Sequence, residues 1–363
     1  MIRDIENKFR KCFELAVKGE TLAFPNPNVA CLIYFNEELV ASGIHQEFGK
    51  AHAEVNAINN LKEYFTKHSD LQSRFSNFQN FASSCEFILN LEPCSHYGNT
   101  PPCTLLIEES GFRKIAFAAY DTNPIVYKKS LEKFSDSSYE VTRPEDLSKE
   151  IQSEAQFINR AFFSVKKKEA SNELAVYISL KIASYPNGNM ITKEGDQWIT
   201  GEESRKDVHR LRSTNQIIIT SSSTLKADKA KYNVRHSAED LNLLDTKDPD
   251  LCVIYNQEKI EAQELDSSRK VFYEKLDDLE KESLEKLIRK LSFQGYQKII
   301  IEAGPRISHA FLESGLVDEF IAYQPKEDRS ESEFIESVKN EFQFDNSRQK
   351  VFDFEKDFKV VFY

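Results

Sequence analysis

The chain has 363 residues, of which 29% are charged, and its formal net charge is −11. This length suits two domains of ordinary size, each with its own hydrophobic core. The acidic balance disfavours a general nucleic-acid surface, which needs clustered lysine and arginine, so we expect a small-molecule substrate and no nucleic acid. No run of the sequence approaches the ~18 apolar residues that a membrane helix requires, so no membrane partner is expected.

The six cysteines have irregular spacings, and no apolar signal segment precedes them. The first residues of the chain instead carry charges at Arg3, Asp4, Glu6, Lys8 and Arg10. A secreted disulfide scaffold is therefore disfavoured, and the reducing cytoplasm is the expected compartment.

Helix and strand patterns alternate in the first third of the chain. In order, we expect a helix that ends at Gly19, a strand hairpin of 29–34 and 38–44, a helix at 51–61, a strand at 87–91, a helix at 102–109 and a strand at 114–118. This order predicts a central sheet flanked by helices. Residues 61–84 are expected to form an extended helix or a loop insertion without catalytic candidates.

A polar, charged stretch separates the two halves, and part of it, 147–165, has a helical pattern. We place the boundary near Lys168, which gives a first domain at 1–145, a linker region at 146–170 and a second domain at 171–363. The second domain is expected to contain strands at 174–182, 216–220, 251–255 and 298–302, and helices at 201–211, 276–291 and 309–314. The Gly304-Pro305 turn before the last helix is a plausible phosphate cradle, though such turns occur in many loops.

The most informative motif is His52-Ala53-Glu54, followed by a segment at 91–103 that contains Cys94 and Cys103. One imidazole and two thiolates fill three positions of a tetrahedral zinc and leave the fourth for water, as in catalytic zinc sites. Zinc lowers the pKa of its water to about 7, and Glu54 could then carry the water proton to a leaving amine. Nucleobase deaminases use this arrangement, but their second cysteine usually follows three residues after the first. By themselves the cysteines could also form a structural metal knuckle or be inert buried thiols.

Across its whole length the chain resembles the bifunctional riboflavin-biosynthesis deaminase/reductase family. The resemblance is carried by Pro25-Asn26-Pro27-Asn28-Val29, the His52 triplet, the segment from Leu91 to Cys103 and Asp121 with Asn123-Pro124. The eight-residue gap between the cysteines is this family's own form. The resemblance implies a cytidine-deaminase-like three-layer α/β/α domain followed by a dihydrofolate-reductase-like α/β domain.

For the first domain, the resemblance implies zinc-dependent hydrolytic deamination of 2,5-diamino-6-(5-phosphoribosylamino)pyrimidin-4-one. One zinc ion per chain would be held by His52, Cys94 and Cys103, with Glu54 as the catalytic proton shuttle. The implied substrate-binding residues are Asn26, His45, His96, Asp121 and Asn123. The family commonly has Lys or Arg, suited to the substrate phosphate, where this chain has Asn99.

For the second domain, the resemblance implies NADPH-dependent reduction of the ribosyl group to ribityl. The implied substrate-binding residues are Lys181, Arg212, Tyr232, Arg235 and Glu302. The implied cofactor-binding residues are Ala183, Trp198, Thr224, Asp228, Gly304, Pro305, Arg306, Ile307, Ser308, His309 and Ala310. The sequence has no Gly-X-Gly-X-X-Gly fingerprint, which agrees with a cofactor site unlike the Rossmann fold.

The second domain also departs from the family pattern. The usual Ser-Leu-Asp-Gly is Tyr185-Pro186-Asn187-Gly188, Lys229 reverses a charge beside Asp228, and the loop before Trp198 is one residue short. Hydride transfer needs the two reacting carbons near ~3.5 Å, so shifts of these loops matter.

Three alternatives stay open at this stage. The first is a deaminase whose reductase-like domain is catalytically impaired. The second is a different zinc deaminase, acting on a free base or on RNA. The third is a non-catalytic, zinc-stabilised binding module. The resemblance further implies a homo-oligomer, a dimer or a tetramer.

Overall fold

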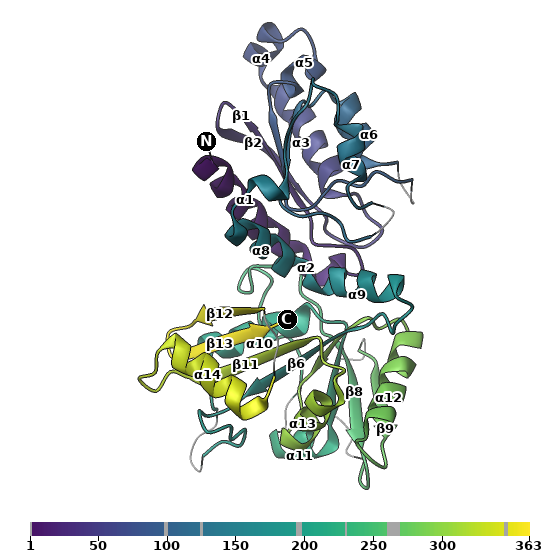
Figure 1. The fold of residues 1–363 in the computed structure, drawn as a ribbon, viewed down its shortest axis with the longest axis vertical. Helices are drawn as coiled ribbons and strands as arrows, with labels where there is room; N and C mark the ends of the chain where they lie inside the picture. The colour runs from purple at the N-terminus through teal and green to yellow at the C-terminus, as the bar shows by residue number, and fades with distance from the viewer. Residues whose placement is uncertain are drawn as a thin grey trace. The chain divides into compact units, whose positions relative to one another are not determined.

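A computed structural model describes residues 2–97, 101–123, 126–193, 198–228, 231–259, 269–344 and 348–363. The chain divides into two compact units, one of Met1–Glu173 with Asn242–Asp245 and the other of Leu174–Leu241 with Thr246–Tyr363 (Figure 1). Within the described ranges, no helix is both long enough and apolar enough to cross a membrane.

The first unit is built on a five-stranded sheet in the order β2-β1-β3-β4-β5. The strands are β1 (Ala30–Phe35), β2 (Glu38–Ile44), β3 (Glu86–Leu89), β4 (Lys114–Phe117) and β5 (Glu140–Thr142). Strand β1 pairs antiparallel with β2 and β3, while β3, β4 and β5 are mutually parallel. The predicted hairpin turns at Asn36 and Glu37, both with positive φ, as tight two-residue hairpin turns require.

Helices cover both faces of this sheet because side chains of a strand alternate between its faces. Cys31, Ile33 and Phe35 pack with α3 (Ala53–Lys67) and α6 (Cys103–Glu109). Leu32 and Tyr34 pack with α1 (Ile2–Ala16) and α8 (Lys149–Ile158). The helices of this unit are α1 (Ile2–Ala16), α2 (Glu20–Ala23), α3 (Ala53–Lys67), α4 (Ser69–Arg74), α5 (Phe78–Ala82), α6 (Cys103–Glu109), α7 (Lys129–Lys133), α8 (Lys149–Ile158) and α9 (Arg160–Ala170). Two short 3-10 turns span Val17–Gly19 and Pro144–Asp146.

The segment at 146–170, assigned to a linker region with a helical pattern at 147–165, forms helices α8 and α9. Ile151, Ala155 and Ile158 of α8 are buried in the core that also contains Phe9 and Phe13 of α1. Apolar residues at a spacing of three and four form one face of a helix, and that face is buried against the sheet.

The second unit is built on an eight-stranded sheet in the order β12-β13-β11-β6-β10-β7-β8-β9. Its strands are β6 (Tyr177–Ala183), β7 (Ile217–Ser221), β8 (Asp250–Tyr255), β9 (Val271–Lys275), β10 (Lys298–Ile301), β11 (Glu319–Pro325), β12 (Gln349–Asp353) and β13 (Asp357–Phe362). The six strands from β11 to β9 are parallel, and β13 and β12 close one edge in antiparallel pairs.

Helices α12 (Lys281–Phe293), α13 (Pro305–Ser314) and α14 (Glu331–Phe342) pack on one face of this sheet, and α10 (Glu202–Ser213) and α11 (Ser222–Asp228) pack on the other. The helix predicted at 309–314 begins earlier, at Pro305, because proline is favoured at the first helical position. The helix predicted at 276–291 begins at Lys281, and β9 precedes it. Two consecutive α/β units confirm the predicted fold class.

Candidate active sites

Strand directions bring the predicted residues of the first unit to one edge of its sheet. Parallel strands β3 and β4 end at the edge where the antiparallel strand β1 begins and β2 ends. Asn26 precedes β1, His45 follows β2, Cys94 follows β3 and Asp121 follows β4. The carboxyl ends of parallel strands are the usual place for ligand sites in open α/β sheets.

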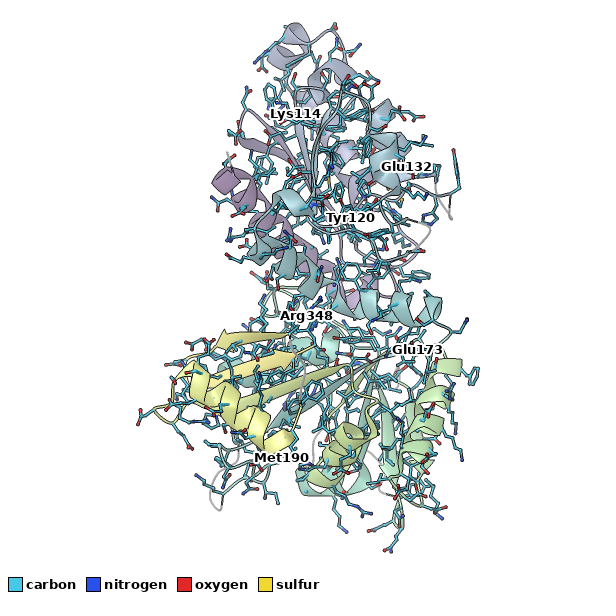
Figure 2. All side chains as sticks on the ribbon, viewed as in Figure 1. Lys114, Tyr120, Glu132, Glu173, Met190 and Arg348 are labelled. Carbon is cyan, nitrogen blue, oxygen red and sulfur yellow. The ribbon has the colours of Figure 1, made fainter. Side chains whose placement is uncertain are left out.

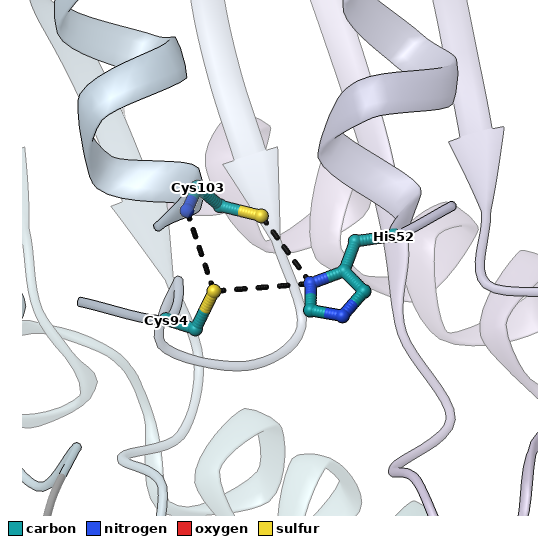
Figure 3. Close-up of side chains that lie close together, drawn as sticks. All are labelled: His52, Cys94 and Cys103. Carbon is teal, nitrogen blue, oxygen red and sulfur yellow. Dashed lines mark hydrogen bonds between the residues drawn. The ribbon is translucent and has the colours of Figure 1, made fainter. Parts of the chain in front are cut away.

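His52, Cys94 and Cys103 form a compact cluster at this edge (Figure 3). The His52 Nδ1 atom lies 3.8 Å from the Cys94 sulfur and 3.3 Å from the Cys103 sulfur. The three ligand atoms all lie within 4.8 Å of one another. His52 immediately precedes α3, and Cys103 is the first residue of α6. A donor set of one nitrogen and two sulfurs at this separation fits a tetrahedral zinc with one position left for water.

Helix α3, which carries this site, packs very closely against β2. A Cβ atom added at Gly43 would lie 2.3 Å from the Ala53 carbonyl oxygen and 2.4 Å from the Ala57 nitrogen. The Asn56 side chain also donates a hydrogen bond to the Ile44 carbonyl at 2.9 Å. Only glycine allows this approach, which sets the position of the first turn of α3 and therefore of His52 and Glu54.

Of the two cysteines, Cys94 is the one whose surroundings favour the thiolate form. A hydrogen bond from Cys103 lowers the pKa of Cys94 to about 4, so Cys94 is a thiolate, and its interaction with His52 raises the pKa of the imidazole. The pKa of Cys103 is raised, first by Cys94 and then by burial. The Cys103 backbone amide also donates to the Cys94 sulfur at 3.3 Å. A thiolate is the form of cysteine that binds metal.

Glu54 lies in the first turn of α3 and is only 4% exposed. Burial, followed by the negative charge of Cys94, raises the pKa of its carboxyl group. A carboxyl group with a raised pKa can both take up and release a proton near neutral pH.

His45 and Asn26, two predicted substrate-binding residues, contact each other beside the cluster. The His45 Nδ1 group donates to the Ala51 carbonyl at 3.1 Å, so Nε2 is free to accept the Asn26 amide at 3.0 Å. The His45 ring centre lies 5.6 Å from that of His52. Burial lowers the pKa of His45, which therefore stays neutral and keeps the Asn26 side chain in place.

Asp121 and Asn123 follow Tyr120, which is labelled in Figure 2. The Asp121 carboxylate accepts the Asn123 backbone N–H at 2.8 Å, and burial raises the pKa of Asp121 to about 6. His96 Nδ1 is buried and has no hydrogen-bond partner among the described residues. Buried polar atoms of this kind usually meet a ligand or water. Asn99 and Pro124 lie outside the described residues.

A buried asparagine network, which sequence reasoning missed, holds the turn that contains Asn26. Asn159 accepts the Asn28 backbone N–H at 2.7 Å and donates to the Asn28 carbonyl at 3.1 Å. Asn90 donates to the same carbonyl at 2.7 Å and accepts the Ala30 N–H at 2.8 Å. In the sequence, Asn90 could have been noticed because it follows an apolar strand directly. No local pattern marks Asn159, because its partner Asn28 is distant in the sequence.

In the second unit, an ion pair joins two of the predicted substrate-binding residues, Arg212 and Glu302. Arg212 of α10 donates through Nε and Nη2 to the two carboxylate oxygens of Glu302, each at 2.8 Å. Lys181 Nζ lies 3.9 Å from Glu302, and the Arg212 guanidinium lies over the Tyr232 ring at 5.3 Å. Burial alone would raise the pKa of Glu302, but Arg212 and then Lys181 hold it below its usual value.

Arg235 belongs to a neighbouring basic group. Its Nη2 atom lies 3.5 Å from His209 Nε2, and the His236 ring lies 5.0 Å from that of His209. Burial, and then the charges of Arg212 and Arg235, lower the pKa of His209 to about 4. The positively charged Arg235 guanidinium therefore lies beside the neutral imidazole of His209.

Ala183, Thr224 and Gly304, three of the residues predicted to bind cofactor, lie at or just after the carboxyl ends of β6, β7 and β10. Ala183 ends β6, and the Gly304 N–H donates to the Thr224 hydroxyl at 3.1 Å. Residues 305–310 form the first turns of α13. Trp198 instead contacts Arg205, whose guanidinium lies 5.3 Å from the indole ring centre. The Asp228 side chain, Lys229 and residues 194–197 lie outside the described part.

Two family models match the chain. The cytidine and deoxycytidylate deaminase zinc-binding region matches residues 3–119, and the RibD C-terminal domain matches residues 177–325. The riboflavin biosynthesis protein RibD of Aquifex aeolicus is 29% identical over 338 residues, with 89% of this chain and 87% of that protein covered. RibD of Escherichia coli is 28% identical over 339 residues, with 86% and 85% covered.

Solved structures agree with these matches in fold. Form 2 of Acinetobacter baumannii RibD is 25% identical, with a TM-score of 0.68 and 99% of each chain covered. A diaminohydroxyphosphoribosylaminopyrimidine deaminase/5-amino-6-(5-phosphoribosylamino)uracil reductase from Thermotoga maritima has a TM-score of 0.71 at 23% identity, with 99% of this chain and 98% of that chain covered.

Proposed function

Because this chain belongs to the RibD family of riboflavin-biosynthesis enzymes, with a zinc-binding deaminase domain followed by a reductase domain, we propose that it acts on two successive pyrimidine intermediates. The first step is hydrolytic deamination of 2,5-diamino-6-(5-phosphoribosylamino)pyrimidin-4-one to 5-amino-6-(5-phosphoribosylamino)uracil. The second step is NADPH-dependent reduction of the ribosyl group to ribityl.

The observation that carries this proposal is the cluster of His52, Cys94 and Cys103 next to buried Glu54. These three side chains would hold one zinc ion, which when bound acidifies water and so supplies the nucleophile at neutral pH. Glu54 takes the water proton and then donates a proton to the departing ammonia. Its raised pKa suits both roles.

Neutral and acidic side chains around this cluster suit the substrate ring. The Asn26 amide, oriented by His45, can bind a ring carbonyl or nitrogen. Asp121, Asn123 and His96 supply further hydrogen-bonding groups, and the pKa of Asp121 at about 6 leaves it mostly ionised at neutral pH. An ionised Asp121 can accept hydrogen bonds from the amino groups of a diaminopyrimidine.

In the second unit, we assign the sugar phosphate to Arg235 and the ribosyl hydroxyls to Lys181 and Glu302. Arg212 orients Glu302 through the two hydrogen bonds described above. Tyr232 packs against Arg212 and accepts a hydrogen bond from Thr220 at 2.9 Å. NADPH, when bound, supplies the hydride, and the protein supplies position. Trp198, Ala183, Thr224 and Asp228, with the start of α13 from Gly304 to Ala310, would hold the cofactor.

The turn that departs from the family pattern is well ordered by its own contacts. Gly188 has a φ of 77° and donates its N–H to the Tyr185 carbonyl at 2.9 Å. The Ser337 hydroxyl donates to the Pro186 carbonyl at 2.9 Å, and Asn187 accepts the Asn189 N–H at 3.1 Å. Asn187 thus keeps an acceptor where the family has a carboxylate but lacks its charge, which is the change that favours the deaminase-only alternative.

A coupled assay tests both steps. Purified protein with zinc and NADPH is given the diaminopyrimidine, and ammonia release and NADPH oxidation are followed separately. Both signals are expected, and in the Glu54→Gln variant both should disappear while zinc stays bound. Ammonia release without NADPH oxidation would support the deaminase-only alternative. Full turnover by Glu54→Gln would contradict the proton shuttle.

We further propose that the enzyme is a homo-oligomer, which analytical ultracentrifugation of the same protein would test.

A further inference from the structure

Glu92 is a buried carboxylate two residues before Cys94 that neither the proposed metal cluster nor the proposed proton shuttle uses. It lies between β3 and Cys94 and is only 3% exposed. Its backbone N–H donates to the Ala119 carbonyl at 2.8 Å, just after β4. Glu92 therefore sits where the segment that carries a predicted metal ligand meets the segment that carries Asp121.

Four hydrogen bonds to the Glu92 carboxylate come from residues between 121 and 130. One carboxylate oxygen accepts the backbone N–H groups of Asp121 at 3.3 Å and Lys128 at 3.0 Å. The other accepts the N–H of Ser130 at 3.1 Å and its hydroxyl at 2.7 Å. Three of the four donors are backbone groups, so the carboxylate fixes the course of the chain itself.

Burial of the charged Glu92 carboxylate has a large free-energy cost. A carboxylate taken out of water loses several kcal/mol of hydration, which neutral donors offset only when every bond is made. An ionised acceptor nevertheless makes stronger hydrogen bonds than a neutral one. The four bonds of Glu92 engage both oxygens and offset part of this cost, while burial still raises the pKa of the carboxyl group.

The bonds continue from Glu92 to the side chains that would face substrate. The Asp121 carboxylate accepts the Asn123 N–H, and the Asn123 carbonyl accepts the N–H groups of residues 126 and 127 at 2.8 and 2.9 Å. On the outer side, the Lys128 ammonium lies over the rings of Tyr120 and Tyr127 at 4.9 and 5.3 Å. The segment is therefore held from inside by Glu92 and from outside by this lysine.

We propose that Glu92 is a positioning residue, which holds Asp121, Lys128 and Ser130 so that Asp121 and Asn123 face the metal cluster and bind the pyrimidine. This inference rests on the proposed deaminase function. It makes Glu92 a determinant of substrate affinity that touches neither substrate nor metal.

The Glu92→Gln variant tests this role. Glutamine keeps the shape of the glutamate side chain, but its NH₂ group cannot accept a hydrogen bond. The two donors that face the carboxylate oxygen replaced by NH₂ therefore lose their acceptor. We expect amide exchange to become about tenfold faster at Lys128 or at Ser130, whichever N–H then faces the NH₂ group, and the KM of deamination to rise about tenfold, because bonds to a charged buried acceptor are lost. Zinc content should remain one per chain, and kcat should change less than KM.

A matched control and a milder variant complete the experiment. Glu145→Gln alters an exposed carboxylate that accepts the Tyr120 hydroxyl at 2.9 Å, and it should leave KM and the two amides unchanged. Ser130→Ala removes one donor to Glu92 and should show a smaller effect of the same kind, even if Glu92→Gln does not fold.

Unchanged exchange at both amides in the folded variants would overturn the inference. So would a loss of zinc with KM unchanged, because that result would mean that Glu92 only stabilises the cysteine loop. Wild-type protein that releases no ammonia would refute the proposed function instead, and amide exchange would then decide by itself whether Glu92 holds the segment.

Discussion

The Arg212–Glu302 ion pair gives the sharpest test of how the second unit is built. Replacement of Arg212 by methionine leaves the Glu302 carboxylate, whose side chain is 5% exposed, with Lys181 at 3.9 Å as a weaker charged neighbour. Two hydrogen bonds of 2.8 Å are lost with the guanidinium. Removal of one partner of a buried pair typically costs about 3–5 kcal/mol, so we expect a loss of this size at pH 7.

The double variant Arg212→Met/Glu302→Gln should be more stable than the single variant Arg212→Met. Its two replacements leave no uncompensated charge in the interior, because glutamine is neutral and methionine fills most of the arginine volume. The two residues are in direct contact, so a coupling free energy of about 2 kcal/mol is expected from the double-mutant cycle.

The pH dependence of the loss follows from the Glu302 pKa. In the wild type this pKa is lowered, so the pair contributes stability above the usual value of 4.5 and loses it as the pH falls through the folded value. Without Arg212, burial raises the same pKa, so the variant loses stability as the pH rises above 4.5. The difference between the two proteins should therefore be large at pH 7 and should decrease as the pH falls below 4.5 toward the lowered folded pKa of Glu302.

Urea unfolding followed by tryptophan fluorescence measures this difference directly. Trp198 is the only tryptophan in the chain and lies in the second unit, so its emission reports on that unit. Ammonia release by the first unit should stay at the wild-type rate and serves as the control. A loss below about 1 kcal/mol for Arg212→Met, or additive effects in the double variant, would refute the reasoning, since contacting residues should couple.

Three further predictions concern the first unit. Glu54→Gln should lower the kcat of deamination by roughly 10²–10⁴ with zinc still bound, measured by ammonia release and metal analysis; a kcat within threefold of the wild type would contradict the shuttle. Asp121→Asn should increase the free energy of unfolding by up to ~3 kcal/mol at pH 7. The folded pKa of about 6 exceeds the usual 3.8, so the wild type loses stability as the pH rises from 3.8 to 6, and asparagine, which does not ionise, avoids this loss. Thermal unfolding at pH 4 and 7 checks this, and an equal gain at both values would exclude the titration of Asp121 as its cause. Gly43→Ala should cost ~1–3 kcal/mol and weaken zinc retention against a chelator, because its Cβ would push the start of α3 away from β2; unchanged retention would show that α3 tolerates the shift.

Sequence reasoning worked best where one segment carries its own pattern. The alternation around Asn36 predicted the first hairpin, and the apolar spacing in 51–61 predicted the start of α3, although the helix extends to Lys67. It failed where a pattern depends on distant partners. Elements after 314, namely β11, α14, β12 and β13, were not predicted. The helix at α8 was predicted, but only its burial against α1 shows that it belongs to the core of the first unit.

The sequence by itself determined the chemistry of the first site. Histidine, glutamate and two cysteines at those spacings predict a zinc centre with a proton shuttle, and His52, Cys94 and Cys103 do lie together, because residue types and short spacings define a candidate ligand set. The tertiary structure alone decided which distant groups hold one another: Arg212 with Glu302, Asn159 with Asn28, and Glu92 with Lys128. Such contacts depend on strand order and on the close approach of helices, which no local pattern of residues encodes.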